Sequence, residues 1–377
     1  EHRLACLPHL PEAARHYILQ ASRETEGEAH RKAMVAIDGL LDFPWRPTVD
    51  SPETRSDAEM AERIRQTRQV LDREVYGNRE AKESILRLVA KWLRNGQSGG
   101  MALGLCGPPG VGKTLFAKTL GEALQIPQRT IGLGGMGDAA DLIGHSYTYA
   151  NAQYGAIIRQ LIAAGEWRCV LFFDEVDKVS LRSGVNEIGH VLMQITDPEM
   201  SVHYQDRFYS SAIEFDLSGV LAVFSYNDQD KLDPVLRNRL VQIDVSGYSV
   251  EDKLQISRTH LLPRLLGEVR LSEQVTFPTR VLQYLIRHYS REGGIRSLTR
   301  ILEHLILDIN LRLCEGESEE SVVVTRALCE QLLPASRQSS SVLDGEARVG
   351  RSYAMYATPS GEGGVISLQV SAPAGRS

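Results

Sequence analysis

The amino-acid sequence predicts an α/β fold in which helices cover a parallel sheet, followed by a helical domain. Three short apolar runs, Met101–Cys106, Val170–Phe173 and Val220–Phe224, are separated by segments whose apolar residues recur at helical spacing. Short buried strands that alternate with helices are typical of a parallel sheet with both faces covered. Beyond Gly247 the apolar runs end and only helical patterns follow, which indicates an all-helical second domain.

Helical patterns also precede the predicted sheet. Residues 1–42 carry apolar side chains at helical spacing. The run Phe43–Pro47 ends this pattern, because proline cannot continue a helix. A charge-rich helix is expected next, over Ser51–Asp72. We therefore expect a helical arm before the α/β domain.

Helices are expected throughout the second domain. Ser249–Asp252 has the pattern of a capping box, and the helix that it opens is expected to reach Leu262. Pro278 suits the first turn of a second helix. A third helix carries an apolar stripe between Leu298 and Ile309. Glycines between β-prone segments predict a hairpin over Tyr353–Val370.

Composition restricts the partners and the compartment. The 377 residues carry a net charge of −6, so nucleic acid is not indicated as the main partner. No apolar stretch approaches the ~20 residues that span a bilayer. The five cysteines are scattered, form no CxxC pair and are expected to be small core residues. With no leader pattern after Glu1, we expect an intracellular protein of the cytoplasm or an organelle matrix, such as a mitochondrion or peroxisome, and not a secreted one.

A glycine-rich segment predicts a phosphate-binding loop. The sequence from Gly107 to Thr114 matches GxxxxGK[ST], follows an apolar run and opens a helical pattern. Backbone N–H groups of such a loop converge on phosphates, and the helix N-terminus adds partial positive charge. Lys113 is expected to reach the outer phosphates and Thr114 to bind Mg²⁺. The candidate phosphate-binding residues are Gly107, Pro108, Pro109, Gly110, Val111, Gly112, Lys113 and Thr114.

Polar residues follow the other two apolar runs. Asp174 and Glu175 come directly after the second run, where carboxylates rarely occur without a task. Asp174 is expected to bind Mg²⁺, and Glu175 to act as the general base for the attacking water. Asn227 follows the third run and is expected to orient that water, although a turn residue is an alternative for it.

Arginines are candidates for stabilising the transferring phosphoryl group. Arg237 and Arg239 follow the third apolar run, and an arginine there suits this role in its own chain or across to a neighbour. Arg296 follows Gly293–Ile295 at the start of a long helix, from which it is expected to reach the γ-phosphate. A solvated surface side chain is the alternative for any one of them. Together with the phosphate loop, these residues predict a Mg²⁺-dependent ATPase.

The order of these motifs resembles the Lon protease family of ATP-dependent serine proteases, from near the N-terminus to the end of the chain. The stretches that carry the resemblance are Leu41–Trp45, Tyr76–Gly77, Leu133–Gly135, Gly144–His145, Thr148–Tyr149, Asp197–Glu199, Phe215–Ser218, Ser246–Tyr248, His260–Arg264 and Arg291–Arg296. The resemblance implies an AAA+ P-loop NTPase with a helical lid.

The resemblance also implies roles for single residues. Tyr76 and Gly77 match the segment on the adenine side of the nucleotide. Asn227 matches the first sensor, Arg239 the arginine finger that acts across a subunit boundary, and Arg296 the second sensor. These matches imply a homo-oligomer, a hexameric ring.

A substrate pore is implied as well. Tyr149 matches the aromatic residue of the pore loop that grips an unfolded polypeptide, and Ala150 follows it. Family members usually place an aliphatic residue and a glycine after the aromatic, whereas Ala150 and Asn151 stand here. Ser146–Tyr147 replaces the usual basic pair before it. These departures imply a weaker grip on the substrate and leave the ATP chemistry intact.

The end of the chain resembles only the start of a Lon protease domain. That domain uses a serine activated by a lysine, and no lysine follows Lys253, so peptide-bond cleavage by this chain is not expected. The expected parts are a helical N-terminal arm over 1–47, an AAA+ nucleotide-binding domain over 48–248, a lid over 249–333, a Ser-rich linker over 334–348 and the start of a protease domain over 349–377.

Several functions fit this sequence. The leading hypothesis is an ATP-driven motor that unfolds and threads unfolded or damaged protein substrates, as the ATPase part of a Lon-type protease. A stand-alone remodelling ATPase without protease activity is the alternative. A ring subunit that binds nucleotide without turnover is disfavoured by the presence of Lys113, Glu175 and Arg239. A DNA-directed motor is disfavoured by the acidic balance and by the Lon-like stretches.

Overall fold

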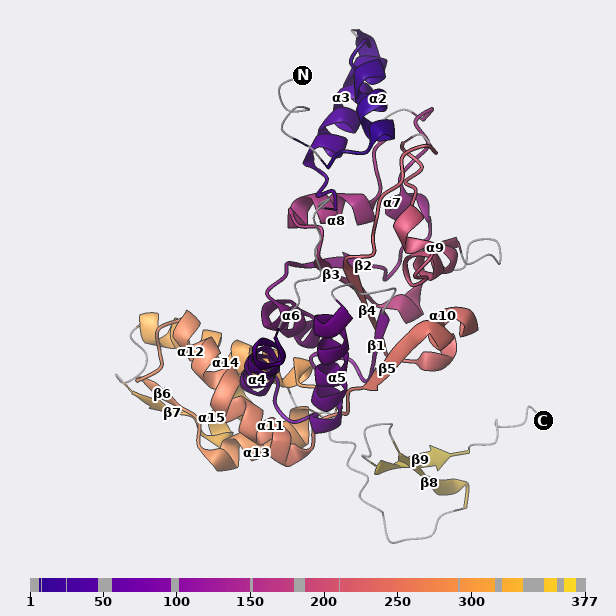
Figure 1. The fold of residues 1–377 in the computed structure, drawn as a ribbon. Coiled ribbons are helices and arrows are strands. Elements are labelled where there is room, and N and C mark those ends of the chain that lie inside the picture. Colours follow the sequence, from indigo (N-terminus) through magenta and orange to yellow (C-terminus); the bar gives the residue numbers. More distant parts are fainter. Residues whose placement is uncertain are drawn as a thin grey trace, which may run out of the picture. The chain divides into compact units, whose positions relative to one another are not determined.

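The computed structural model has two compact units, one made of residues 1–107 and 112–245 and the other of 108–111 and 246–377 (Figure 1). The residues that it describes are 7, 9–24, 26–46, 56–95, 102–149, 152–179, 187–209, 211–290, 292–315, 321–334, 349–357 and 363–370. Among them, no helix is both long and apolar enough to cross a membrane.

The first unit is built on a five-stranded parallel sheet with the strand order β2-β3-β4-β1-β5. Its strands are β1 (Ala102–Cys106), β2 (Gln128–Gly132), β3 (Cys169–Asp174), β4 (Val220–Tyr226) and β5 (Leu240–Asp244). The three apolar runs of the sequence are the three central strands, which confirms the predicted parallel sheet. Because the strands are parallel, the carboxyl ends of β1, β3 and β4 meet at one edge of the sheet.

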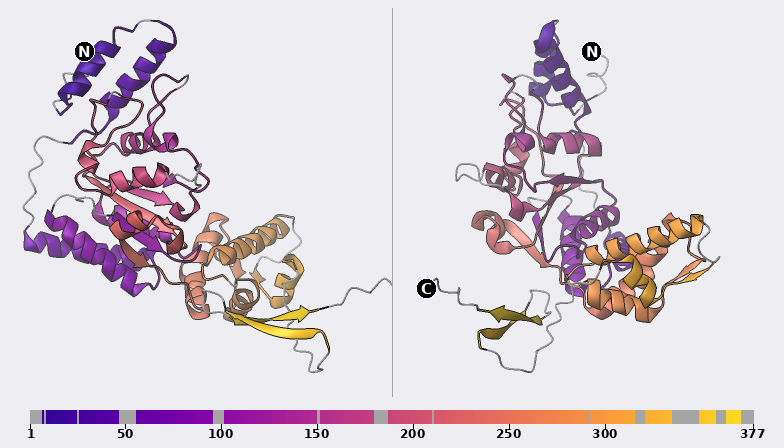
Figure 2. Two further views of the ribbon diagram at one scale, coloured as in Figure 1. Left: turned by 90° about the vertical axis from the view of Figure 1, so that its right-hand side faces the viewer. Right: turned by 180° about the vertical axis from the view of Figure 1, so that it is seen from behind.

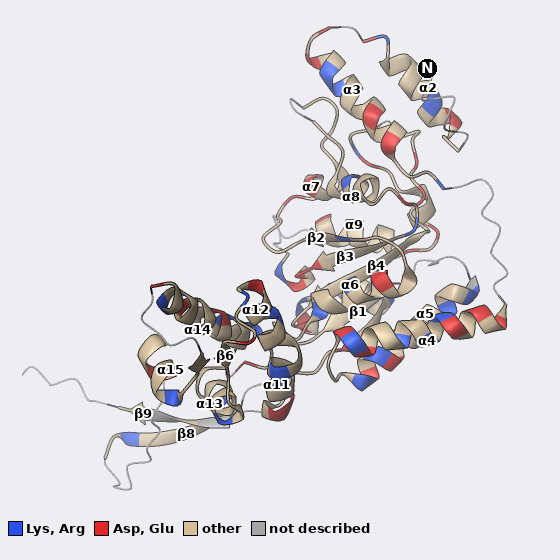
Figure 3. Ribbon diagram, turned by 90° about the vertical axis from the view of Figure 1, so that its left-hand side faces the viewer, with Lys and Arg blue, Asp and Glu red and all other residues tan. Residues whose placement is uncertain are grey.

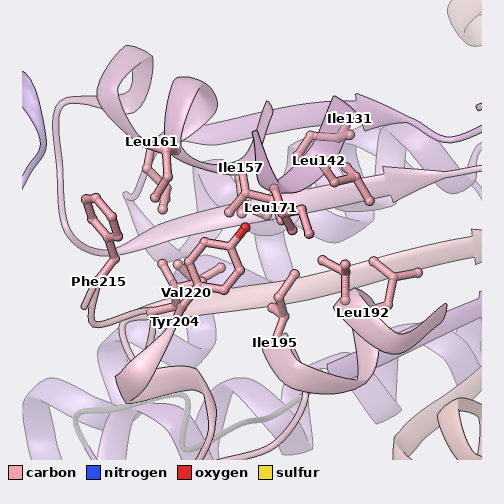
Figure 4. Packing of buried hydrophobic residues seen from close by; sticks show 14 of the residues in the cluster. Ile131, Leu142, Ile157, Leu161, Leu171, Leu192, Ile195, Tyr204, Phe215 and Val220 are labelled. Carbon is pink, nitrogen blue, oxygen red and sulfur yellow. The ribbon is translucent and has the colours of Figure 1, made fainter. Parts of the chain in front are cut away.

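Helices cover both faces of this sheet. On one face, α7 (Ala140–Ile143), α8 (Ala156–Ala164) and α9 (Glu187–Ile195) enclose a core that includes Leu171 of β3 and Val220 of β4 (Figure 4). On the other face, α6 (Lys113–Leu124) contacts β2, β3 and β4. Side chains of a strand alternate between the two faces, so central strands covered twice are apolar throughout.

The N-terminal arm is helical, as expected, and the segment after it packs on the α/β core. α2 (Glu12–Ala21) and α3 (Gly27–Asp42) lie side by side (Figure 2). Trp45 stacks on Phe215 with their ring centroids 5.4 Å apart, and Arg46 forms a 3.2 Å ion pair with Asp216. Two of the Lon-like stretches, far apart in the sequence, therefore pack together at this point.

Two charge-rich helices precede β1. α4 (Asp57–Glu74) begins at a capping box formed by Ser56 and Glu59, and α5 (Arg79–Asn95) follows it. Both helices carry many basic and acidic residues, at which the ribbon of Figure 3 is blue and red. α4 contacts both α5 and α6. The expected start of this helix at Ser51 is wrong, because Ser56 is the extended N-cap and the helix begins at Asp57.

The second unit contains the expected helices, but one of them runs further than predicted. The capping box is confirmed, since Ser249 Oγ accepts from the N–H of Asp252 at 3.1 Å. α11 (Val250–Ile256) continues through a π-helical turn, Ser257–Leu261, into α12 (Leu262–Glu268), so the helix does not end at Leu262. Pro263 lacks an N–H, which accounts for the change of hydrogen-bonding pattern just before it. The remaining helices are α13 (Thr279–Tyr289), α14 (Arg296–Cys314) and α15 (Arg326–Leu332).

Short strands add to this helical unit. β6 (Val275–Thr276) pairs in parallel with β7 (Val322–Val323), so the expectation that every element here is helical is wrong in this detail. A strand of two residues is too short to show the alternation of apolar and polar residues, so only its pairing in the tertiary structure reveals it. The predicted hairpin is confirmed as β8 (Arg351–Ala357) and β9 (Gly363–Gln369), an antiparallel pair (Figure 2). Of the cysteines, Cys314 is exposed, contrary to expectation, whereas Cys169 and Cys329 are buried.

Candidate nucleotide site

The predicted phosphate loop connects β1 to α6, which is the strand-to-helix context that the motif requires. Gly110 and Gly112 have φ angles of +79° and +93°, in the region that favours glycine. A Cβ atom on Gly107 would lie 2.2 Å from the carbonyl oxygen of Val245, so no side chain fits at that position. The loop backbone is therefore shaped by its glycines.

Lys113 is the first residue of α6, and its ammonium group lies at the carboxyl edge of the sheet. Lys113 Nζ donates to Gly107 O at 2.5 Å and to Asn227 Oδ1 at 2.7 Å. Burial lowers the pKa of Lys113, while the carboxylates of Asp177 and Asp174 act in the opposite direction. Gly107 O and Asn227 Oδ1 are neutral acceptors, and an anionic phosphate oxygen is a stronger acceptor than either. A nucleotide phosphate is therefore able to compete for this ammonium group.

Asp174 and Glu175 lie at the end of β3, and a serine on β4 links them. Ser225 Oγ donates to Asp174 Oδ1 and accepts from the N–H of Glu175 at 3.1 Å. Glu175 has a φ of +60°, which is rare for a residue with a side chain. Its carboxylate contacts the ammonium of Lys178, and a Cβ on Gly134 would lie 2.2 Å from Glu175 Oε2. The glutamate is thus held in one orientation at the strand end.

Asp177 positions the turn that carries Asn227. It lies in the short helix η1 (Val176–Lys178), and its Oδ2 accepts from the N–H groups of Asn227 at 3.0 Å and Asp228 at 3.3 Å. Among the described residues, no side chain or backbone group pairs with its buried Oδ1. Neither Asp177 nor Ser225 was predicted from the sequence. The signals that would have found them are the carboxylate three residues after Asp174 and the hydroxyl two residues before Asn227.

Mg²⁺ chemistry suits the oxygen groups at this edge. Thr114, on the first turn of α6, offers a hydroxyl, and Asp174 offers a carboxylate. Within the part of the chain that the structure describes, no three His, Cys, Asp or Glu side chains group as a metal site. Mg²⁺ on a nucleotide is commonly bound by one or two protein oxygens, with phosphate and water completing its shell. The residues present therefore fit a Mg²⁺ ion that arrives with its nucleotide.

Arg239 is not brought to this cluster within its own chain. It ends α10 (Pro234–Arg239) and lies against α9, where Nη1 donates to Met193 O at 2.8 Å. Its Nη2 forms a 3.1 Å ion pair with Asp197. Hydrogen bonds from the N–H groups of Met200 and Glu199, together with Arg239, lower the pKa of Asp197. Arg239 is therefore fixed in direction by an ionised carboxylate.

The predicted adenine-side residues lie in the segment between α4 and α5. Tyr76 is half-buried, and Gly77 has a φ of +64°. Gly77 lines a cavity of about 400 Å³ together with Arg68, Leu71, Asp72, Asn78, Arg79, Lys82, Glu83 and Leu86. The walls of this cavity are mostly charged, and Tyr76 is not among its lining residues. The cavity is therefore lined by Gly77 and not by Tyr76.

The predicted pore residue lies in an exposed loop. Tyr149 is 65% exposed, and Ala150 lies outside the described residues. The base of this loop is held by the buried Asp206, whose carboxylate accepts from the N–H groups of Gly155 at 2.7 Å and Phe208 at 2.9 Å. Tyr149 is thus presented to solvent on a loop with a fixed base.

In the second unit, Arg296 adjoins the tip of the phosphate loop. Arg296 is the first residue of α14 and is exposed. The N–H of Ile295 donates to Gly110 O at 3.0 Å, and a Cβ on Gly110 would lie 3.0 Å from the Cβ of Arg296. A Cβ on Gly294 would lie 2.3 Å from Pro109 O, which explains the glycine before Arg296. The start of α14 and the loop tip are therefore in backbone contact.

Comparison with known families agrees with this geometry. The model of the ATPase family associated with various cellular activities (AAA) matches residues 103–247. The model of the Lon protease AAA+ ATPase lid domain matches residues 269–322. The chain belongs to the AAA+ ATPases of the Lon protease family. An AAA domain binds ATP and implies ATP hydrolysis.

Relatives that carry the Lon name match most of this chain. The chain is 45% identical over 318 residues to a Lon protease homolog of Acanthamoeba polyphaga mimivirus, which covers 82% of this chain and 31% of the relative. It is 33% identical to a mitochondrial Lon protease homolog of Caenorhabditis elegans over 77% of this chain and 29% of the relative. It is 32% identical to a Lon protease of Roseiflexus castenholzii over 98% of this chain and 44% of the relative. The chain thus spans less than half the length of these Lon relatives.

Proposed function

We propose that this chain is a Mg²⁺-dependent ATP-hydrolysing motor that unfolds and threads protein substrates, as the ATPase part of a Lon-type protease. The observation that carries the proposal is the cluster at the carboxyl edge of the sheet. Lys113, at the start of α6, bonds to Asn227 just after β4. Ser225 of β4 bonds to both Asp174 and Glu175 at the end of β3. An intracellular setting, in the cytoplasm or an organelle matrix, is part of the proposal.

Each residue of the cluster has one task in this mechanism. The loop from Gly107 to Gly112 surrounds the phosphates with backbone N–H groups, and Lys113 exchanges a neutral acceptor for a γ-phosphate oxygen. Thr114 and Asp174 hold Mg²⁺, which neutralises charge on the phosphates. Glu175 accepts a proton from the attacking water, and Asn227 orients that water.

The adenine end and the second unit complete the proposed site. Tyr76 and Gly77 contact the adenine side, and Arg296 binds the γ-phosphate from the start of α14. Hydrolysis removes the group that Arg296 holds, so the free energy of this contact changes with the nucleotide state. This coupling is how ATP turnover drives movement.

A hexameric ring is part of the proposal. Arg239 acts on the nucleotide of the neighbouring subunit, and its ion pair with Asp197 fixes the direction of the guanidinium. Tyr149 faces the central pore, which its 65% exposure supports, because an aromatic residue that grips a passing chain must be free of the core. Unfolded or damaged proteins are the proposed substrates.

The first test replaces the proposed general base. We expect Glu175→Gln to lower the turnover of ATP by about 10²–10⁴-fold, because the amide cannot accept the proton of the attacking water. ATP binding should remain, since the amide keeps the shape of the side chain. Turnover is measured by phosphate release and binding by a fluorescent ATP analogue. Glu122→Gln, at an exposed position near the end of α6, is the control. Equal turnover in Glu175→Gln and in the parent protein would reject the assignment.

The second test addresses action between subunits. We expect Arg239→Ala alone to be inactive, because no guanidinium then stabilises the transferring phosphoryl group. Mixing this variant with Lys113→Ala subunits should restore part of the turnover, since each supplies what its neighbour lacks. Full activity of pure Arg239→Ala rejects the finger. Absence of rescue in mixtures that still assemble, as measured by light scattering, rejects action across the boundary.

A further inference from the structure

Lys253 is a buried cation to which the proposed mechanism assigns no task. It lies on α11, and only 2% of its surface is exposed. Lysine is almost never this deeply buried unless its charge has partners, because removing an ammonium group from water is costly. A buried lysine therefore indicates that its charge is needed at that place.

The ammonium group of Lys253 binds main-chain carbonyl oxygens of the loop that leads into α14. Lys253 Nζ donates to Ser290 O at 2.9 Å and also to Glu292 O. Ser290 is the C-cap of α13, where the helix dipole and the last carbonyl groups favour a cation. The lysine thus holds the end of α13 and the following loop together through one charged group.

The same loop is tied to the start of α14 and to the residues before α11. Glu292 Oε1 accepts from the N–H of Ser297, in the first turn of α14. Gly293 O accepts from the N–H of Tyr248 at 2.8 Å, and Tyr248 Oη donates to Val111 O at 3.0 Å. The loop therefore has a hydrogen-bonded partner on each side.

The loop before α14 also contacts the phosphate loop. Ile295 donates its N–H to Gly110 O at 3.0 Å, and Arg296 follows directly. The two segments are packed closely at this contact, because a Cβ on Gly294 would lie 2.3 Å from Pro109 O. If the residues bound by Lys253 shift, Arg296 and the tip of the phosphate loop are therefore expected to shift with them.

We propose that Lys253 is a positioning residue for ATP hydrolysis, whose buried ammonium group fixes the loop between α13 and α14 and thereby places Arg296. This proposal rests on the proposed function, because it requires Arg296 to act on the nucleotide. Lys253 itself touches no nucleotide. Its effect passes through the contacts of Ser290 and Glu292 to Ile295.

The test is a double-mutant cycle on the full chain, with kcat and KM for ATP as readouts. Lys253→Met keeps the apolar stem and removes the ammonium group. We expect it to lower kcat by about 10- to 100-fold, as small misplacements of a functional group do. Added to Arg296→Ala, it should lower kcat no further, because a misplaced arginine and an absent one are equivalent.

A matched control separates positioning from general loosening of the helical unit. Leu305 is fully buried on α14, nine residues or about 13 Å beyond Arg296. Leu305→Ala creates a cavity without touching the loop, and we expect it to leave kcat within about twofold of the parent at temperatures where it is folded. A fall in kcat equal to that of Lys253→Met would overturn the proposal.

The remaining outcomes are also decisive. If Arg296→Ala slows turnover and Lys253→Met slows it again by its full factor, the two act independently and the positioning role is rejected. If Arg296→Ala has no effect on turnover, the role of Arg296 in the proposed function fails first, and the proposal for Lys253 fails with it. Should Lys253→Met not fold, the same cycle is run with Lys253→Gln, whose neutral amide is one atom shorter than the lysine side chain and so weakens both contacts, and the same outcomes apply.

Discussion

Lys113 and Lys253 differ in how the protein uses a lysine. Lys113 is partly exposed, and its ammonium group is bound to a side-chain amide and a carbonyl oxygen at the carboxyl edge of the sheet. Lys253 is buried, and its ammonium group is bound to carbonyl oxygens of a loop that it holds in place. The first is open to an arriving anion, whereas the second is closed to solvent.

The comparison shows what separates a ligand-binding charge from a structural one. Part of the environment of Lys113 is available for exchange, because a phosphate oxygen replaces a neutral acceptor with a gain in electrostatic energy. Nothing gains access to Lys253 without unfolding the loop. Whether a ligand can reach a lysine, and whether it can replace the lysine's hydrogen-bond partner, therefore indicates function better than the residue type does.

The largest expected effect is on turnover at Lys113. We expect Lys113→Met to lower kcat/KM for ATP by about 10²–10³-fold, because a preorganised charge at the phosphates is lost. Its melting temperature should stay close to that of the parent protein. Phosphate-release kinetics and calorimetry measure the two quantities, with Lys118→Met on the same helix as control. A large drop in melting temperature would make Lys113 a structural lysine and break the comparison.

The next effect is on stability at Lys253. We expect Lys253→Met to lower the free energy of unfolding by about 1–3 kcal/mol, since the carbonyl groups of Ser290 and Glu292 lose a buried donor. Urea denaturation followed by circular dichroism measures it. Arg258→Met, on the exposed side of the adjoining π-helical turn, should change the free energy of unfolding far less. Equal changes in the two variants would show that the buried charge carries no special stability.

The smallest effect sharpens the comparison with a buried anion, Asp206. Burial raises the pKa of Asp206 to about 7, although its hydrogen bonds from Gly155 and Phe208 and the charge of Arg159 oppose this. The folded state therefore keeps a proton that the unfolded chain releases near pH 4, and this stabilisation is lost as pH rises through 7. The free energy of unfolding should fall by about 1 kcal/mol between pH 6 and pH 8 from this group.

That pH dependence is measured by urea denaturation at several pH values. Asp206→Asn should reduce the slope, because the amide does not titrate, whereas Asp230→Asn at an exposed site should leave it unchanged. A slope equal to that of the parent protein in Asp206→Asn would mean that the carboxylate stays ionised in the folded state. Main-chain N–H groups would then be sufficient to hold a buried anion, as carbonyl groups hold the buried cation at Lys253.

The sequence predicted the middle of the sheet and missed its edges. β1, β3 and β4 are covered on both faces and appear as apolar runs. β2 and β5 are edge strands with exposed and half-exposed positions, so no apolar run marks them. Only pairing with a central strand makes these segments strands.

Among the helices, too, one local feature was predicted from the sequence and one that depends on tertiary packing was not. The capping box at Ser249 was readable, because its two side chains are three residues apart on one helix turn. The π-helical turn at Ser257–Leu261 was not predicted, since it depends on how the following Pro263 is accommodated when α12 packs on α14.

What the sequence by itself determined is the contiguous chemistry: the phosphate loop with Lys113, the Asp174–Glu175 pair and the arginine after Gly293–Ile295. Within each of these signals the residues are only a few positions apart, so backbone geometry alone relates them. The tertiary structure decided which groups hold them: Asn227 on Lys113 across 114 positions, Ser225 on Asp174 across 51, and Lys253 on the loop before Arg296 across 37 and 39. Hydrogen bonds and buried charges act over a few ångströms in space, and folding alone brings such distant segments within that range.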